Sequence, residues 1–215
     1  NKDIKSVIKT LKSNYLTSGP LVKKLEKKIC KFVNVKYAVV VNSASSALHI
    51  SCLALGLKLN DNFWTSTNSF VASANCGTLC GAKVDFVDIS LKDFNISVNN
   101  LRSKLKKTKK NKIPKIIIPV HIGGYSSDMY SLKKLSNIYK FKIIEDASHA
   151  FGGLYKNKKV GNCKFSDITV FSFHPVKIFT TGEGGVAVTN NKKIYEKMVK
   201  MRNNGLVKTQ SNFKN

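Results

Sequence analysis

The stretch ITVFSFHPVKIFTTGEGGVAVT, from Ile168 to Thr189, contains two strand-like runs on either side of a loop. Both runs, Ile168 to Phe173 and Gly185 to Thr189, are almost continuously apolar, which is typical of strands that are covered on both faces. Since a loop joins them and not a helix, we expect them to be antiparallel. The loop contains one lysine, Lys177. The stretch therefore predicts the buried centre of a sheet, with a lysine at its edge.

Similar apolar runs predict further strands. They are Tyr37 to Val41, Lys83 to Ile89, Lys115 to Val120 and Phe141 to Glu145, with a weaker one at Asn62 to Ser66. Amphipathic stretches between them predict helices at Leu21 to Phe32, Ser45 to Leu55, Phe70 to Cys80, Asp128 to Tyr139 and Lys192 to Arg202. This alternation indicates an α/β fold, with a mostly parallel sheet of roughly seven strands and helices on both of its faces.

The length of 215 residues, with 42% hydrophobic residues, is enough for one domain with a large core. No apolar run approaches the roughly 20 residues that span a membrane, and the N-terminus has no secretory signal, so we expect no membrane partner. The chain begins at Asn1 and stops in the polar stretch Thr209 to Asn215. We therefore expect a fragment of a longer protein.

The net charge of +25 invites an interpretation as a nucleic-acid-binding protein. However, only two of the 37 basic residues are arginines, Arg102 and Arg202, and arginine is the preferred residue for bidentate contacts to phosphates and bases. The lysines are scattered, and their densest run, Ser103 to Lys112, predicts a helix end followed by a solvated loop. We expect no nucleic-acid partner, although such a charge would attract an anionic substrate.

The five cysteines form no CxxC pair. Cys76 and Cys80 are four residues apart in an apolar helical stretch, with no histidine nearby, so we expect no metal site. Buried free thiols in a reducing compartment are the simpler interpretation, and they indicate a cytoplasmic protein.

In open α/β sheets, ligands bind beyond the carboxyl ends of the strands. The first predicted strand is followed by Asn42 to Ile50, a turn of small hydroxylated residues that opens a helix. Free backbone N–H groups at such a helix start bind a phosphate well, and an ordinary serine N-cap is the alternative.

The strand Phe141 to Glu145 is followed by DASHAFGG, starting at Asp146. Glu145 and Asp146 are adjacent, so their side chains point to opposite faces, and we expect one of them to face the strand-end crevice. A carboxylate held there needs a cation, a metal or a protonated ring nitrogen as its partner. The alternative is an Asp that caps a helix, beside a hydrogen-bonded His149.

Lys177 follows a third strand and is flanked by Val176, Ile178 and Phe179. These neighbours predict apolar surroundings that would desolvate the amine and make it a nucleophile, whereas a lysine that extends to solvent is the alternative. A phosphate-binding turn, a strand-end acid and such a lysine are together the parts of a pyridoxal 5'-phosphate site.

The ordered motifs of the chain resemble those of the DegT/DnrJ/EryC1/StrS family of nucleotide-sugar aminotransferases. The segments that carry the resemblance are YLTSGPLVKKLE, VVVNSASSALH, NSFVASANCGTLCGAKVDFVDI, IPVHIGGYSSDM, IEDASHAFGG and SDITVFSFHPVKIFTTGEGGVAVTN. The resemblance implies that residues 1–215 are the cofactor-binding large domain of an aspartate-aminotransferase-like (type I) fold. The small C-terminal domain of the family is absent from this chain.

The resemblance also implies individual roles. Lys177 matches the Schiff-base lysine and proton shuttle, Asp146 the acid at the pyridine nitrogen, and His149 the residue near the ring hydroxyl. The other implied contacts are Ser172, Ala44 and Ser45 at the cofactor phosphate, Phe70 stacked on the ring, and Asn14, Tyr15, Leu16 and Thr17 at the substrate.

The HPVK and DASHA forms look most like the family's pseudaminic-acid branch. This implies transamination at the C4 keto group of a UDP-linked 4-keto-6-deoxy-N-acetylhexosamine, with L-glutamate as amino donor and a homodimer when full length. The presence of Lys177 argues against the family's dehydratase members, where a histidine replaces it. Other sugar-nucleotide aminotransferases, such as perosamine-type or 3-keto-sugar enzymes, and a non-catalytic fragment are the alternatives. Two departures are Ala44-Ser45, where the family more often has Gly-Thr, and Asn204, where it usually has His.

Overall fold

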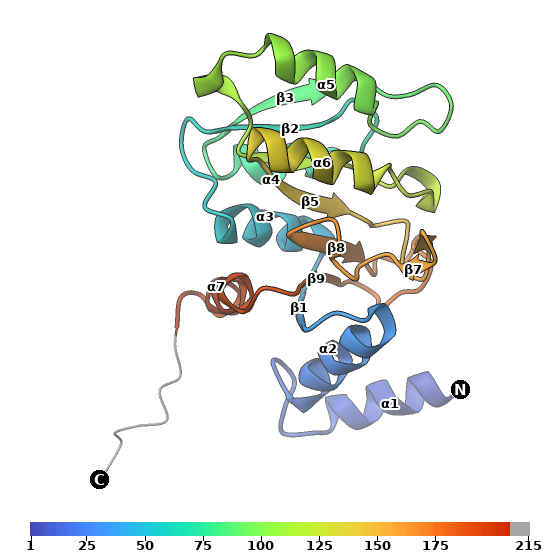
Figure 1. Ribbon diagram of the computed structural model, residues 1–215. Helices are drawn as coiled ribbons and strands as arrows, with labels where there is room; N and C mark the ends of the chain where they lie inside the picture. Colours follow the sequence, from blue (N-terminus) through green and yellow to red (C-terminus); the bar gives the residue numbers. More distant parts are fainter. Residues whose placement is uncertain (207–215) are drawn as a thin grey trace.

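A seven-stranded sheet lies between two layers of helices in the computed structural model, which describes residues 1–206 (Figure 1). The strand order is β1-β9-β8-β5-β4-β2-β3. The strands are β1 (Tyr37–Val41), β2 (Asn62–Ser66), β3 (Lys83–Val87), β4 (Ile116–Ile118), β5 (Lys142–Asp146), β8 (Ile168–Ser172) and β9 (Gly185–Thr189). The predicted α/β fold is therefore confirmed, including the strand that the sequence indicated only weakly.

Strand β9 runs antiparallel to both of its neighbours, β1 and β8. The pairs β8–β5, β5–β4, β4–β2 and β2–β3 are parallel. Ser172, the last residue of β8, lies opposite Gly185, the first residue of β9, so the chain turns back on itself after β8 as predicted. The loop with Lys177 consequently lies at the carboxyl end of β8, at the same edge of the sheet as the carboxyl ends of β1 and β5.

Three helices pack on each face of the sheet. One face is covered by α3 (Ala44–Ala54), α4 (Ala72–Thr78) and α7 (Lys192–Arg202). The other is covered by α2 (Pro20–Val33), α5 (Val98–Lys107) and α6 (Met129–Tyr139). The strands supply side chains to both layers in alternation, since Ile116 and Ile118 pack on one side and Ile117 on the other. This two-sided burial explains why the strands are almost continuously apolar.

Several elements differ from the prediction. Helix α1 (Lys2–Leu11) was not predicted, although Ile4, Val7, Ile8 and Leu11 have helical spacing. A hairpin of β6 (Leu154–Tyr155) and β7 (Lys158–Lys159) was also missed, because its strands have only two residues each. The predicted helix end in the basic run is the end of α5, and a short 3-10 helix follows at Lys110–Lys112. The stretch Thr209 to Asn215 lies outside the described residues.

None of the helices within residues 1–206 combines the length and apolar composition that crossing a bilayer requires. In the same part of the chain, His, Cys, Asp and Glu side chains do not gather in groups of three that would hold a metal ion. Cys52 and Cys76 are packed in the core with their sulfur atoms 3.7 Å apart, and both are free thiols.

The start of β9 is pressed against the turn that leads into α3. A Cβ atom on Gly185 would collide with the backbone of Ser43 and of Ala44. Backbone atoms cannot move aside as the end of a flexible side chain can, so only glycine fits here. The β9 strand therefore fixes the position of the first turn of α3.

We expect Gly185→Ala to displace the Ser43–Ala44 turn and to lower the free energy of unfolding by about 1–3 kcal/mol, the usual cost of overpacking. Thermal unfolding measures the loss. Gly182→Ala is the matched control, because a Cβ there meets open space and the change costs only the strain of its positive φ of 80°. Equal losses of stability in the two variants would contradict the role given to Gly185 in shaping this turn.

Candidate active site

A cavity of about 470 Å³ opens at the carboxyl ends of β1, β5 and β8. Its lining includes all seven residues that the sequence predicted as catalytic or cofactor-binding: Ala44, Ser45, Phe70, Asp146, His149, Ser172 and Lys177. These residues come from four separate parts of the chain, so their convergence is a property of the fold. Their individual roles remain predictions.

The first turn of α3 forms one wall of the cavity. The hydroxyl of Ser43 caps the helix, accepting a hydrogen bond from the backbone N–H of Ser46 at 3.1 Å. The serine N-cap is therefore present, and it leaves the N–H groups of Ala44 and Ser45 without partners inside the helix. The first turn contains no acidic residue. The positive end of the helix dipole thus faces the cavity, as an anion requires.

Asp146 ends β5 and is only 4% exposed. The hydroxyl of Ser73 donates to its Oδ2 at 2.6 Å, and the hydroxyl of Ser148 donates to its Oδ1 at 2.6 Å. The ion pairs found within residues 1–206 do not include Asp146. A buried carboxylate of this kind has donors but no cation, and it lies beside the cavity where a cationic group would complete it.

Ser73 and Ser148 were not singled out from the sequence. The backbone contact of Ser148 could have been predicted, because an Asp side chain commonly accepts a hydrogen bond from the N–H two residues later in an Asx turn. The N–H of Ser148 does donate to Asp146 at 3.2 Å. Ser73 is 73 residues away in sequence. Only the packing of α4 against the end of β5 brings it to the carboxylate.

The amine of Lys177 lies 2.8 Å from Nε2 of His149. Burial lowers the pKa of His149, and the nearby charge of Lys177 lowers it further, while Asp146 acts in the opposite direction. A neutral imidazole at position 149 can accept a hydrogen bond from the lysine. His149 therefore holds the lysine amine toward the end of β5.

The predicted apolar surroundings of Lys177 are wrong in one respect. Val176 is 76% exposed and Ile178 is 63% exposed, so these two neighbours face solvent and do not bury the amine. Phe179 does pack inward, with its ring 4.9 Å from that of Phe151 and 4.6 Å from that of Phe173. The aromatic contact anchors the loop, but it does not enclose the amine.

The mouth of the cavity is lined by Phe70, which is 70% exposed, and by Glu183 and His174. Phe70 thus lines the cavity, and its stacking on a cofactor ring stays a prediction. The predicted substrate turn Asn14 to Thr17 is exposed between α1 and α2 and is not part of the cavity lining. Its role at the substrate stays a prediction.

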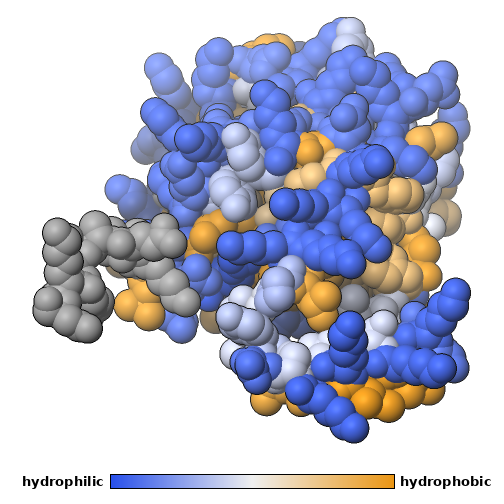
Figure 2. Space-filling model, turned by 90° about the horizontal axis from the view of Figure 1, so that it is seen from below, coloured by the Kyte–Doolittle hydropathy of each residue, from blue (hydrophilic) through white to orange (hydrophobic). Residues whose placement is uncertain are grey.

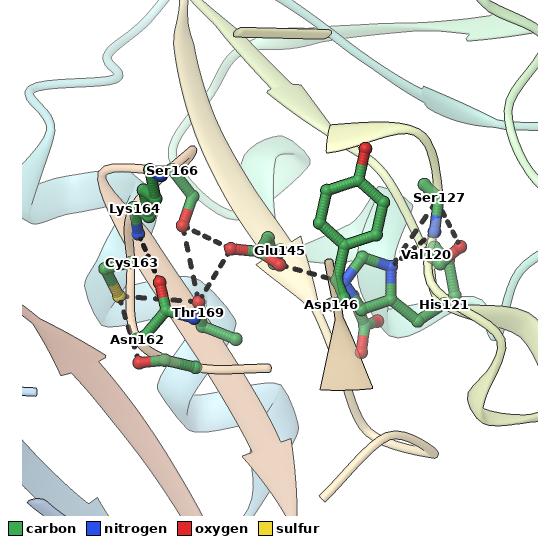
Figure 3. Close-up of polar contacts among 12 residues, drawn as sticks. Val120, His121, Ser127, Glu145, Asp146, Asn162, Cys163, Lys164, Ser166 and Thr169 are labelled. Atoms are coloured by element: carbon green, nitrogen blue, oxygen red, sulfur yellow. Dashed lines mark hydrogen bonds and ion pairs between the residues drawn. The ribbon is translucent and has the colours of Figure 1, made fainter. Parts of the chain in front are cut away.

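Glu145 points to the opposite side of β5 from Asp146. It lies between His121 on one side and Ser166 and Thr169 on the other (Figure 3). His121 Nε2 is 2.9 Å from the carboxylate, and Thr169 donates at 3.0 Å. Burial opposes ionisation of Glu145, but the hydrogen bonds and charge of these partners outweigh it and hold its pKa below the ordinary value. His121 was not singled out from the sequence, because it is fully buried in an otherwise apolar segment.

Comparison with known proteins agrees with this geometry. Residues 1–215 match the DegT/DnrJ/EryC1/StrS aminotransferase family. The chain belongs to this family. A UDP-4-amino-4,6-dideoxy-N-acetyl-beta-L-altrosamine transaminase from Campylobacter jejuni is 43% identical over 206 residues, which are 96% of this chain and 53% of that protein.

Two solved structures have the same fold as this chain. Helicobacter pylori PseC, an aminotransferase involved in the biosynthesis of pseudoaminic acid, has a TM-score of 0.88 and 36% identity, over 100% of this chain and 56% of PseC. NtdA from Bacillus subtilis, solved with the cofactor PMP bound, has a TM-score of 0.80 and 30% identity, over 93% of this chain and 45% of NtdA. The chain spans about half the length of the curated relatives it matches.

The pair of Glu145 and His121 gives this family member a pH-dependent stability that can be measured. The pKa of Glu145 in the folded protein lies below its ordinary value of 4.5. The stability it contributes is therefore complete above about pH 4.5 and is lost as the pH falls through the lower folded pKa. We expect Glu145→Gln to destabilise the protein by on the order of 3 kcal/mol at neutral pH, because the change leaves the buried network broken.

Thermal unfolding over a pH series tests this expectation. The difference between the parent and Glu145→Gln should narrow below about pH 4. Glu196→Gln is the control, since Glu196 forms only a surface pair with Lys192 at 3.8 Å and should change little. A gap that stays constant down to acid pH would mean that Glu145 is not ionised in the folded protein.

Proposed function

We propose that this chain is the cofactor-binding large domain of a pyridoxal-phosphate-dependent sugar-nucleotide aminotransferase. The observation that carries the proposal is the single cavity that joins Lys177, Asp146 and the first turn of α3. The membership in an aminotransferase family and the PMP-bound NtdA, which is similar over 93% of this chain, support the cofactor. The chain covers about half of its relatives, so the remainder of the enzyme would come from outside it.

The residues present fit the cofactor. The N–H groups of Ala44 and Ser45, with the hydroxyl of Ser172, would hold the phosphate. The carboxylate of Asp146, which forms no ion pair within residues 1–206, would keep a proton on the pyridine nitrogen. The ring of Phe70 at the cavity mouth would cover one face of the pyridine. When bound, pyridoxal phosphate supplies an electron sink for the carbon beside the transferred nitrogen.

Lys177 would carry out the proton transfer. Its amine would hold the cofactor covalently in the resting enzyme and, once free, would act as general base and acid at the reacting carbon. His149, at 2.8 Å, would keep the amine oriented. Because the pKa of His149 is lowered, its imidazole is neutral at neutral pH. It can therefore accept a hydrogen bond from the lysine amine and does not repel the amine as a second cation.

The proposed substrate is a UDP-linked 4-keto-6-deoxy-N-acetylhexosamine that is aminated at C4, with L-glutamate as the amino donor. The reaction would serve pseudaminic acid and cell-surface polysaccharide biosynthesis. The support is the 43% identity to the altrosamine transaminase and the similarity to PseC. A net charge of +25 would attract the diphosphate of such a substrate.

We further propose a cytoplasmic homodimer for the full-length enzyme. Phe70 and Val176 line the cavity and are exposed, and so are Val71 and Ile178, which lie close to them in the chain. Exposed apolar groups of this kind are typical of interfaces. Figure 2 shows further hydrophobic groups on the side of α1 and α2, where Ile4, Val7 and Leu11 are exposed. Sedimentation of the full-length protein would measure the assembly. The free thiols of Cys52 and Cys76 suit a reducing compartment.

The role of Lys177 is tested by Lys177→Ala in the full-length protein. We expect loss of the visible absorbance band of the lysine-bound cofactor and a drop in activity of at least about a thousandfold, because neither covalent attachment nor proton transfer remains. Lys92→Ala, at an exposed position, is the control. An unchanged spectrum in the Lys177 variant would refute the proposal.

Substrate choice is tested separately. The full-length enzyme would be incubated with L-glutamate and UDP-, GDP- or dTDP-linked 4-keto sugars, and the products analysed by mass spectrometry. We expect amination of the UDP-linked N-acetyl sugar at a rate at least about tenfold above the others, since a site built to hydrogen-bond a group discriminates strongly against substrates that lack it. Preference for a GDP sugar would instead point to a perosamine-type enzyme.

A further inference from the structure

Two serine hydroxyls hold the carboxylate of Asp146 from opposite sides. Ser73, on α4, donates to Oδ2, and Ser148, in the loop after β5, donates to Oδ1, each at 2.6 Å. The backbone N–H of Ser148 adds a third bond to Oδ1 at 3.2 Å. Ser73 is fully buried behind the carboxylate, whereas Ser148 is half-buried and lines the cavity. Each carboxylate oxygen thus has its own hydroxyl donor.

The direction of these bonds matches an ionised carboxylate. An ionised Asp only accepts hydrogen bonds, and short bonds to a charged oxygen are roughly twice as strong as neutral ones. A protonated Asp146 would place its own hydrogen on one of the two oxygens and would compete with the serine that donates there. With three donors in place, the remaining lone pairs are free to accept a bond from a group in the cavity.

Ser73 uses its hydroxyl in an uncommon way for a helical serine. Serines within helices commonly donate back to a carbonyl one turn earlier, as Ser51 does to Ala47 at 2.6 Å. Ser73 donates across to β5 instead. Its backbone N–H bonds to the carbonyl of Phe70 at 3.1 Å, so the same turn of chain that presents the Phe70 ring at the cavity also holds the Asp146 carboxylate.

We propose that Ser73 and Ser148 are positioning residues that keep Asp146 ionised and directed into the cavity, toward a cationic ring nitrogen. The inference rests on the proposed function and extends it to two residues outside the predicted site. Loss of either hydroxyl leaves a buried carboxylate oxygen short of a donor. The ionised form of the carboxylate then becomes less favourable.

The test measures the pyridoxal-phosphate affinity of the full-length protein over a pH series. The parent, Ser73→Ala, Ser148→Ala and the double variant are compared. We expect each single change to weaken binding about tenfold near neutral pH, the loss that follows from one hydrogen bond to a charged group. The acid limit of binding should also move to higher pH. Ser148→Thr, which keeps a hydroxyl, should restore both properties.

Ser51→Ala is the matched control. It also removes a buried hydroxyl, but one that forms no hydrogen bond to Asp146, so this variant should bind the cofactor like the parent. Circular dichroism of the cofactor-free proteins checks folding, and Ser148→Ala carries the test if Ser73→Ala does not fold. Parent-like affinity and pH dependence in both single variants would overturn the inference alone. A parent protein that fails to bind pyridoxal phosphate would overturn the proposed function and the inference with it.

Discussion

Two adjacent buried carboxylates at the end of β5 are the constraint on which the rest of the site depends. Successive side chains of a strand point to opposite faces, so Glu145 and Asp146 must be accommodated in different environments. A buried charge without partners costs several kcal/mol. On one face, the protein itself offsets this cost, because His121 and two hydroxyls surround Glu145. This network ties β5 to β8 and to the loop after β4, and so fixes the strand end from which Asp146 projects.

On the other face, the same requirement is met only in part. Asp146 has hydroxyl and N–H donors from Ser73 and Ser148, which suit its charge but do not neutralise it. The first turn of α3 adds a second unbalanced feature, since its N–H groups and dipole favour an anion. The cavity thus has an acid at one wall and an anion site at another. A ligand with a cationic ring and an anionic arm would satisfy both at once, and this is the physical basis for the cofactor we propose.

The sequence predicts the sheet, Asp146 and Lys177 because these follow from local patterns. Phe70 and Ser172, which also line the cavity, were predicted only from the family resemblance. Apolar runs identify the strands, and the residues directly after them lie at the strand ends by construction. Ser73 could not be found in this way, because its bond to Asp146 depends on how α4 packs against β5. His121 was missed for the same reason, since a histidine in an apolar segment shows its function only once its partner Glu145 is known. Helix α1 could have been predicted, because its apolar residues have helical spacing in the sequence.

Lys177 shows where local sequence misleads. Val176 and Ile178 flank it in the chain but are exposed to solvent, so within residues 1–206 they do not desolvate the amine. His149 holds the amine instead, by a polar contact. Groups that fill the cavity and cover its apolar rim would remove water from the lysine and strengthen its interactions with nearby charges, because electrostatic interactions grow as the surroundings become less polar. The reactivity of Lys177 is therefore a property of the completed site. The sequence around Lys177 contributes the position of the amine and the apolar rim of the cavity.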